Sequence, residues 1–357
     1  MNFKSKFSFL LLVGTYTKSS SEGIYIYRFN TITSKADLIN TVKGIENPSY
    51  LAVTPDHQFV FAVNESGGKN DTVSSLKLNI ANDSLELIDK IIVEGIDPCY
   101  VSVDHQNKNL FIANYSSGNM SAFSISDGVF NPEKQNFQYV GKSIDSARQQ
   151  QSHIHATVLS PDNRYLFATD LGADTIYCFQ YTTNQFPLTP LPHLNTFVKT
   201  GSGPRHLVFS KNASYAYLSN ELNATVTVFS YQNGRLAEIQ TVNLTASTFT
   251  GKSSAADIHL SNDQKFLYVT NRGTANEIVI FNVDQSDGKL HFTDRISSCG
   301  LTPRNFCISP DDSFLLVANQ GSHNICVFLR NKRTGLLTYL SNDIYVDSPV
   351  FLSMIQT

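Results

Sequence analysis

The chain has 357 residues and a formal net charge of −3, so its overall charge does not favour binding to nucleic acid or to an anionic membrane. It contains 24 Phe and 16 Tyr but no Trp, which favours an all-β protein and argues against repeats that end in Trp-Asp. The five cysteines are scattered and form no Cys-x-x-Cys motif. This pattern is typical of small buried thiols rather than of a zinc site or a disulfide framework.

The first residues combine Lys4 and Lys6 with the apolar run FSFLLLVG at 7–14. A short apolar run behind basic residues resembles a weak export signal, but the run is near the minimum length and no small-x-small cleavage site follows it. We therefore expect this run to be part of the fold and the protein to be cytoplasmic, with export as the weaker alternative. No stretch of the sequence is long and apolar enough to span a bilayer.

From residue 48 onward, a pair of short apolar segments recurs about every fifty residues. Each pair alternates apolar and polar residues around a polar turn, as in PRHLVFSKNASYAYLSNE at 204–221, and this pattern predicts a β-hairpin. The pairs fall at 48–65, 98–115, 154–171, 204–221, 256–272 and 303–320. Their second segments end on Asn64, Asn114, Asp170, Asn220, Asn271 and Asn319. A third β-like segment and a weaker fourth follow each pair, which predicts the four-stranded blade of a β-propeller.

The two ends of the chain together supply one more blade. Residues 11–17 resemble the end of a second strand, with Gly14 fifty positions before Asn64, and residues 23–29 and 35–43 resemble a third and a fourth strand. The missing first strand is predicted at 348–355. We therefore expect a seven-bladed propeller whose ring is closed by both ends of the chain, with residues 1–357 as a single domain. The long segment 127–153 is expected to be an excursion over one face.

In a propeller the first strand of each blade is innermost, so residues that enter it and residues that leave the second strand meet at one mouth of the channel. The entry residues are Ser49, Cys99, His153, His155, Arg205, His206, Asp257, Arg304 and Asn305. The exit residues are Glu65, Tyr115, Asp170, Glu221, Arg272 and Gln320. Within the hairpin at 204–221, antiparallel pairing brings Arg205 and Glu221 together.

Each of these features also has a purely structural interpretation. The repeated Asn at strand exits is expected mainly to serve the turn, because Asn tolerates a left-handed φ and caps its own backbone. The His153-x-His155 pair lies on one face of a strand, but no carboxylate or Cys stands at ligand spacing, so no metal is expected. The pair of Arg205 and Glu221 could be a simple salt bridge. Arg272 and Arg304 favour a bound anion, since like charges at one mouth are otherwise costly.

As a set, the motifs VGTYT, NPSYLAVTPD, SHIHA, GPRHLVFS, SNEL, NRGTANEI and PRNFCISPDD resemble the lactonase family of seven-bladed propellers. That family includes bacterial 6-phosphogluconolactonases and a fungal carboxy-muconate lactonising enzyme. The resemblance implies catalytic roles for the His of SHIHA (His153 or His155), Arg205, Glu221 and Arg272. One departure is NRGTANEI, which has Ala275 and Glu277 where the family commonly has an Asn-Ser pair. The other mouth residues are expected to bind substrate, namely His206, Arg304, Asp170, Glu65, Asn271 and Gln320.

The leading hypothesis is therefore hydrolysis of 6-phosphogluconolactone, without a cofactor, by attack of water on the lactone carbonyl. His155, His153 or Glu221 would act as the base, and Arg205 and Arg272 would stabilise the oxyanion and hold the phosphate. One alternative is ring closure of a muconate-like dicarboxylate, or hydrolysis of another sugar lactone, because Arg also recognises carboxylate. Another is a non-catalytic propeller that binds a small anion or a partner protein, and a calcium-dependent gluconolactonase is a weaker option. The sequence leaves the oligomeric state open.

Overall fold

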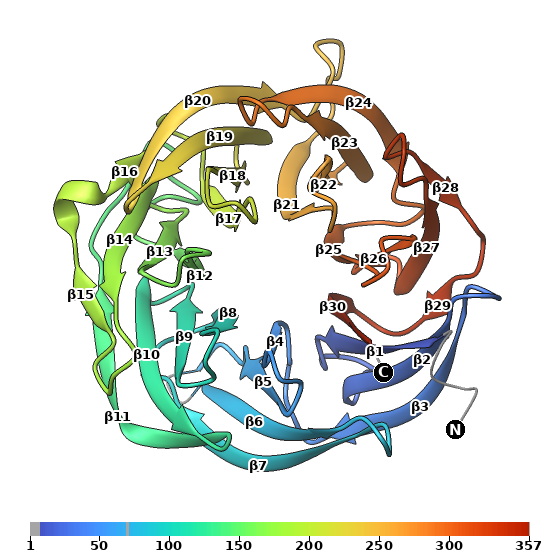
Figure 1. The fold of residues 1–357 in the computed structure, drawn as a ribbon, viewed down its shortest axis with the longest axis horizontal. Coiled ribbons are helices and arrows are strands. Elements are labelled where there is room, and N and C mark those ends of the chain that lie inside the picture. Colours follow the sequence, from blue (N-terminus) through green and yellow to red (C-terminus); the bar gives the residue numbers. More distant parts are fainter. Residues whose placement is uncertain (1–7, 69–70, 357) are drawn as a thin grey trace.

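The computed structural model of the protein describes residues 8–68 and 71–356. Within this part of the chain, antiparallel strands form seven sheets, arranged as blades around a central axis (Figure 1). The predicted all-β, seven-bladed propeller is thus confirmed. Lys4 and Lys6, on which the alternative of an export signal depends, lie outside the described residues, and the apolar run from Ser8 is a strand. No helix in the described residues is long and apolar enough to cross a membrane.

The blades follow one another along the chain, each running from its innermost to its outermost strand. Blade 1 contains β30 (Pro349–Gln356), β1 (Ser8–Thr15), β2 (Gly23–Asn30) and β3 (Lys35–Lys43). Blade 2 contains β4 (Leu51–Val53), β5 (Phe59–Asn64), β6 (Thr72–Asn79) and β7 (Ser84–Ile92). Blade 3 contains β8 (Pro98–Val103), β9 (Asn109–Asn114), β10 (Asn119–Ser126) and β11 (Val129–Gln138).

The remaining blades repeat this order. Blade 4 contains β12 (Ile154–Leu159), β13 (Tyr165–Asp170), β14 (Thr175–Tyr181), β15 (Leu188–Pro190) and β16 (Thr196–Phe197), with the short 3-10 helix η2 (Pro192–Leu194). Blade 5 contains β17 (Pro204–Phe209), β18 (Tyr215–Asn220), β19 (Thr225–Gln232) and β20 (Arg235–Asn243). Blade 6 contains β21 (Ser253–Leu260), β22 (Phe266–Gly273), β23 (Glu277–Val283) and β24 (Leu290–Ser297). Blade 7 contains β25 (Pro303–Ile308), β26 (Phe314–Asn319), β27 (Asn324–Arg330), β28 (Leu337–Tyr339) and β29 (Ile344–Tyr345).

Two blades depart from the expected four strands because their outermost strand is split. In blade 4, Pro187, Pro190 and Pro192 interrupt the strand, since proline cannot donate a hydrogen bond to the ladder. In blade 7 the predicted single strand breaks into β28 and β29 around Ser341, whose φ is 54°. Both breaks lie on the outer rim and leave the inner strands intact.

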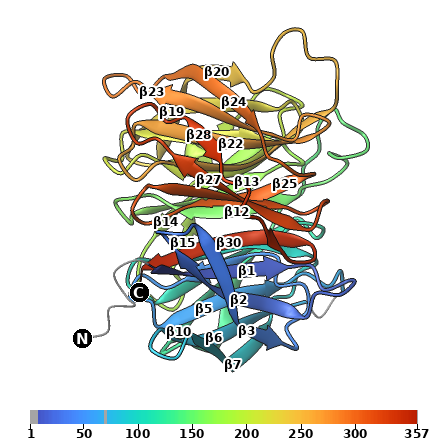
Figure 2. The ribbon, with the colours of Figure 1, turned by 90° about the vertical axis from the view of Figure 1, so that its right-hand side faces the viewer.

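Blade 1 is built from both ends of the chain, as predicted. Strand β30 pairs with β1, for example Leu11 with Met354 and Val13 with Leu352, and the two strands lie side by side in both views (Figures 1 and 2). The register corrects one detail, because Thr15, rather than Gly14, pairs with Pro349. Thr15 therefore occupies the position of Asn64 in the next blade, and Tyr16 is the residue that leaves the strand.

The apolar core lies between neighbouring blades rather than in the central channel. One cluster, for example, joins Phe61 and Val63 of blade 2 to Leu110 and Ile112 of blade 3. The channel itself is filled by rings from the innermost strands. Tyr50 stacks on Tyr100 with 4.2 Å between ring centroids, and Phe351 lies 4.6 Å from Tyr50. His206 of blade 5 lies 5.9 Å from Tyr50 and 5.3 Å from Tyr100, so rings from opposite sides of the channel meet at its centre.

The polar residues that end the second strands form a buried structural ring. Asn64 accepts a hydrogen bond from Ser74 Oγ at 2.9 Å, and Asn220 Nδ2 donates to Thr225 and Thr227 at 2.9 Å each. The expected left-handed φ is wrong, since the six residues Asn64, Asn114, Asp170, Asn220, Asn271 and Asn319 all lie outside the positive-φ set. Their side chains instead bind neighbouring strands and loops, and Asp170 also accepts from the backbone N–H groups of Gly172 and Ala173, which bears out the expected capping of the turn at this position.

Candidate active site

The innermost strands direct their entry side chains to the mouth through a repeated β-bulge. In blade 5, Pro204 pairs with Asn220 and His206 with Ser219, so Arg205 has no cross-strand partner. The same irregularity places His155 in blade 4 and Arg304 in blade 7. A bulged residue turns its side chain out of the regular alternation. The bulge therefore lets entry residues from different blades face the mouth together.

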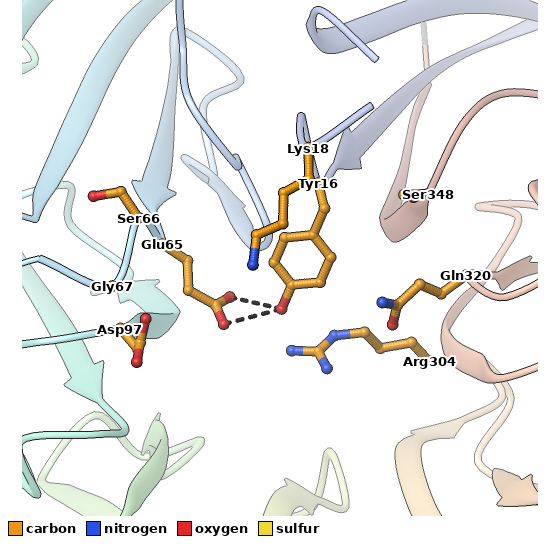
Figure 3. A pocket seen from close by; sticks show the side chains of 9 residues that line it. All are labelled: Tyr16, Lys18, Glu65, Ser66, Gly67, Asp97, Arg304, Gln320 and Ser348. Atoms are coloured by element: carbon orange, nitrogen blue, oxygen red, sulfur yellow. Dashed lines mark hydrogen bonds between the residues drawn. The ribbon is translucent and has the colours of Figure 1, made fainter. Parts of the chain in front are cut away.

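Two cavities open at this mouth, each of about 330 Å³. We call them the inner cavity and the outer cavity. The inner cavity is lined by Glu65, Cys99, Tyr115, Arg148, His155, Glu221, Arg272 and Arg304. The outer cavity is lined by Tyr16, Lys18, Glu65, Ser66, Gly67, Asp97, Arg304, Gln320 and Ser348 (Figure 3). Glu65 and Arg304 belong to both, so the cavities adjoin.

Glu221 is the centre of an ionic cluster in the inner cavity. Its Oε2 lies 3.0 Å from Arg205 Nε and 2.9 Å from Arg272 Nη2. Its Oε1 lies 2.7 Å from Arg148 Nη2. Burial opposes the charge of Glu221, but the cations Arg272 and Arg205 outweigh burial and hold the pKa of this carboxyl well below its usual range. Glu221 is therefore a carboxylate at neutral pH and a poor proton acceptor.

His155 lies beside this carboxylate but, unlike Glu221, is uncharged. Its Nε2 is 3.9 Å from Glu221 Oε2, and its buried Nδ1 has no hydrogen-bond partner in the described part of the chain. Burial, together with the positive charge of Arg205, lowers the pKa of His155 well below its usual value. The imidazole is therefore neutral near pH 7 and carries a free lone pair, as a general base requires.

Arg205 lies behind Glu221, only 2% exposed, and does not line either cavity. Burial and the neighbouring Arg272 lower its pKa to about 10, so it stays charged at neutral pH. Arg205 Nη1 lies 3.2 Å from His206 Nε2, and His206 Nδ1 lies 2.8 Å from Asp257 Oδ1. His206 thus lies between Arg205 and Asp257 and lines neither cavity.

Three other predicted residues are also placed away from the cavities. His153 stacks on Tyr115 and its Nδ1 donates to the Tyr115 carbonyl at 2.9 Å. Asp170 accepts from the backbone N–H groups of His153, Gly172 and Ala173 within 3.0 Å. Asn271 Nδ2 donates to Glu277 at 3.1 Å. Asp170 and Asn271 belong to the buried ring, and Leu171, the residue after Asp170, is the first to leave strand β13.

The structure brings the other predicted residues together. His155, Glu221 and Arg272 line the inner cavity, Gln320 lines the outer one, and Glu65 and Arg304 line both. Among residues 8–68 and 71–356 no group of three or more His, Cys, Asp or Glu side chains is arranged to hold a metal ion.

Sequence reasoning missed Tyr16, Lys18 and Arg148. Tyr16 is equivalent to Glu65 and Glu221, and the one-residue shift at Gly14 concealed it. Lys18 follows it in the same loop. Arg148 comes from the segment between β11 and β12, which has no repeat pattern to align. The excursion predicted over 127–153 was the available signal, but its bounds are wrong, because Val129–Gln138 form the outer strand β11 of blade 3 and only the stretch after β11 carries Arg148.

The chain matches known proteins over nearly its whole length. A family model described as "Lactonase, 7-bladed beta-propeller" matches residues 10–354. Relatives named 6-phosphogluconolactonase include one from Formosa agariphila, 35% identical over 96% of this chain and 99% of its own, and one from Bacillus subtilis, 33% identical over 95% and 96%.

Two solved structures are similarly close to this chain. One is a putative 6-phosphogluconolactonase from Bacteroides fragilis, with a TM-score of 0.94 and 37% identity, covering 99% of this chain and 100% of that one. The other is a periplasmic gluconolactonase from Pseudomonas aeruginosa, with a TM-score of 0.93 and 37% identity, covering 98% and 99%.

Proposed function

The chain belongs to the lactonase family of seven-bladed β-propellers, and from that premise we propose that it is a lactone hydrolase of the 6-phosphogluconolactonase type. The observation that carries the proposal is the inner cavity, where a neutral His155 lies beside an ionised Glu221 that is paired with Arg148 and Arg272, and where Arg304 completes the lining. Such a cavity can activate water and stabilise negative charge in one place. The cytoplasmic location expected from the sequence stays a prediction.

In the proposed reaction, His155 accepts a proton from a water molecule whose oxygen attacks the lactone carbonyl carbon. The carbonyl oxygen becomes an oxyanion, and Arg272 and Arg148, which face the cavity, donate hydrogen bonds to it. The oxyanion then re-forms the carbonyl, the bond from carbon to the ring oxygen breaks, and His155 returns the proton to that oxygen. The product is the open-chain acid.

Glu221 has a supporting role in this scheme. Its low pKa makes it unsuited to take the proton, which favours His155 over the alternatives His153 and Glu221. A fixed carboxylate 3.9 Å from His155 Nε2 would stabilise the imidazolium that forms when His155 accepts the proton. Its bonds to Arg148 and Arg272 also orient the donors towards the oxyanion. Arg205, which lies behind it, would act through Glu221.

The test is hydrolysis of freshly prepared 6-phosphogluconolactone, measured above its spontaneous rate, for the wild type and Arg272→Ala. We expect the variant to lose about a hundredfold or more in kcat, as for one oxyanion donor. The matched control is Arg295→Ala, because Arg295 pairs with Glu277 at 3.6 Å and lines neither cavity. Unphosphorylated gluconolactone is assayed in parallel, since one relative is a gluconolactonase. A folded wild type that hydrolyses neither lactone would overturn the proposal.

A further inference from the structure

Two cations of the outer cavity lack a directly bonded carboxylate in the described residues, unlike the three arginines bonded to Glu221, although the charge of Glu65 acts on Arg304 from further away. In the part of the chain that the structure describes, neither Lys18 nor Arg304 forms an ion pair within 4.0 Å or a side-chain hydrogen bond. Instead, Lys18 Nζ lies 5.7 Å and the Arg304 guanidinium carbon 5.4 Å from the centroid of the Tyr16 ring. Figure 3 shows both cations beside this ring. Two like charges that share one ring repel each other unless an anion joins them.

Tyr16 is itself held in place, so it can hold the two cations in a defined position. Its hydroxyl lies 2.9 Å from each carboxylate oxygen of Glu65. Burial raises the pKa of the Tyr16 hydroxyl, which therefore keeps its proton and donates it to Glu65. The cation–π contacts thus rest on an anchored ring.

The carboxylates of the outer cavity are committed to other groups. Glu65 accepts hydrogen bonds from Tyr16 and from Ser49 Oγ, and burial raises its pKa although the charge of Arg304 opposes this. Asp97 accepts from Ser116 Oγ. Neither forms an ion pair with Lys18 or Arg304. The side-chain amide of Gln320, which also lines the cavity, forms no hydrogen bond in the described residues and is available as a further donor.

From this arrangement we propose that the outer cavity is a phosphate subsite, formed by Lys18 and Arg304, which binds the phosphate monoester of a sugar lactone. This inference rests on the proposed function and makes it more specific. The lactone ester then lies in the inner cavity beside His155 and Arg272. Arg304 lies between the phosphate and the ester of the substrate, because it lines both cavities. A planar guanidinium and an ammonium together suit a doubly charged phosphate.

The experiment compares kcat/KM for 6-phosphogluconolactone with kcat/KM for unphosphorylated gluconolactone. In Lys18→Gln we expect the ratio of the two to fall at least tenfold, mainly through a higher KM for the phosphorylated lactone. Lys252→Gln is the matched control, because Lys252 is an exposed lysine just before blade 6 that lines neither cavity, and its ratio should equal that of the wild type.

A binding measurement makes the subsite testable apart from turnover. Calorimetric titration with 6-phosphogluconate should give a dissociation constant at least tenfold higher in Lys18→Gln than in the wild type. If neither lactone is hydrolysed but this difference is found, the subsite stands and the proposed function fails. An unchanged ratio of kcat/KM values, or equal binding of 6-phosphogluconate by both proteins, would overturn the subsite.

Discussion

His155 is neutral although charged residues surround it, and this has a consequence for the pH dependence of the proposed reaction. Burial is the main cause of its lowered pKa, and Arg205 and His206 add to it, while Glu221 opposes it. A base works only in its unprotonated form. Because the pKa lies well below 6.5, His155 stays unprotonated through the range in which an ordinary histidine titrates.

We therefore expect kcat/KM for unphosphorylated gluconolactone to stay constant from pH 7 down past pH 6.5 and to fall only at lower pH. The unphosphorylated lactone is the better probe here, since a phosphate monoester titrates near pH 6. In Arg205→Gln the loss of a nearby cation should move the acid limb to higher pH, with spontaneous hydrolysis subtracted throughout. A wild-type acid limb centred at pH 6.5 would contradict the assignment of His155 as the base.

At the scale of the strands, the sequence pattern predicted most of the frame but not the whole site. Alternation and the repeated Pro and Asn identified the hairpins, and antiparallel pairing placed Arg205 beside Glu221. The bulge lay beyond this reasoning, because an alternating pattern does not show that one extra residue faces the mouth. For that reason the pattern does not choose between His153 and His155. Asp170 belongs to the buried ring instead of the mouth because it is the last residue of its strand and Leu171 is the residue that leaves it. Tyr16 is hidden from the pattern because the register shift between Gly14 and Thr15 moves the strand exit by one residue.

The segment between β11 and β12 could not be aligned, yet it supplies a cation to the inner cavity. It is fixed to the blades, since Ser143 Oγ donates to Asp174 at 2.6 Å and the buried Gln149 donates to the Leu171 carbonyl at 2.9 Å. Arg148 is held between Tyr115 Oη at 3.1 Å and Glu221 at 2.7 Å. The segment thus presents Arg148 as a preorganised donor.

We predict that Arg148→Ala lowers kcat/KM for 6-phosphogluconolactone by about tenfold to a hundredfold, the range for a charge-assisted bond. Thermal stability should change little, because Arg148 is 43% exposed and Glu221 keeps Arg205 and Arg272. Steady-state kinetics and a thermal melt check both points. Lys142→Ala, in the same segment but outside both cavities, serves as the control. Equal activity in the two variants would exclude a role for Arg148.

At the scale of the whole molecule, polar contacts across the channel connect four neighbouring blades. From Arg205 and His206 in blade 5, they pass to Asp257 in blade 6 at 2.8 Å. Asn305 in blade 7 then donates to Asp257 at 2.5 Å and accepts from the Leu352 backbone N–H in blade 1 at 2.7 Å. The ring closed by β30 is therefore also connected through its centre, and protonation of His206 would disturb these contacts by placing a second cation against Arg205.

This connection predicts how stability responds to acid. Burial, followed by the charge of Arg205, lowers the pKa of His206 from 6.5 to about 4 in the folded protein. Above pH 6.5 the residue is neutral in both states. As pH falls from 6.5 towards 4, the unfolded chain binds a proton that the folded protein does not, so the free energy of unfolding falls, by up to about 3 kcal/mol for this residue.

Urea unfolding of wild type and His206→Asn at pH 7, 6, 5 and 4 isolates the effect, since Asp257 and His259 titrate in both proteins. We expect the wild type to have the larger free energy of unfolding at pH 7. The difference between the two proteins should shrink steadily towards pH 4. A constant difference between the two proteins would show that His206 does not carry this pH dependence.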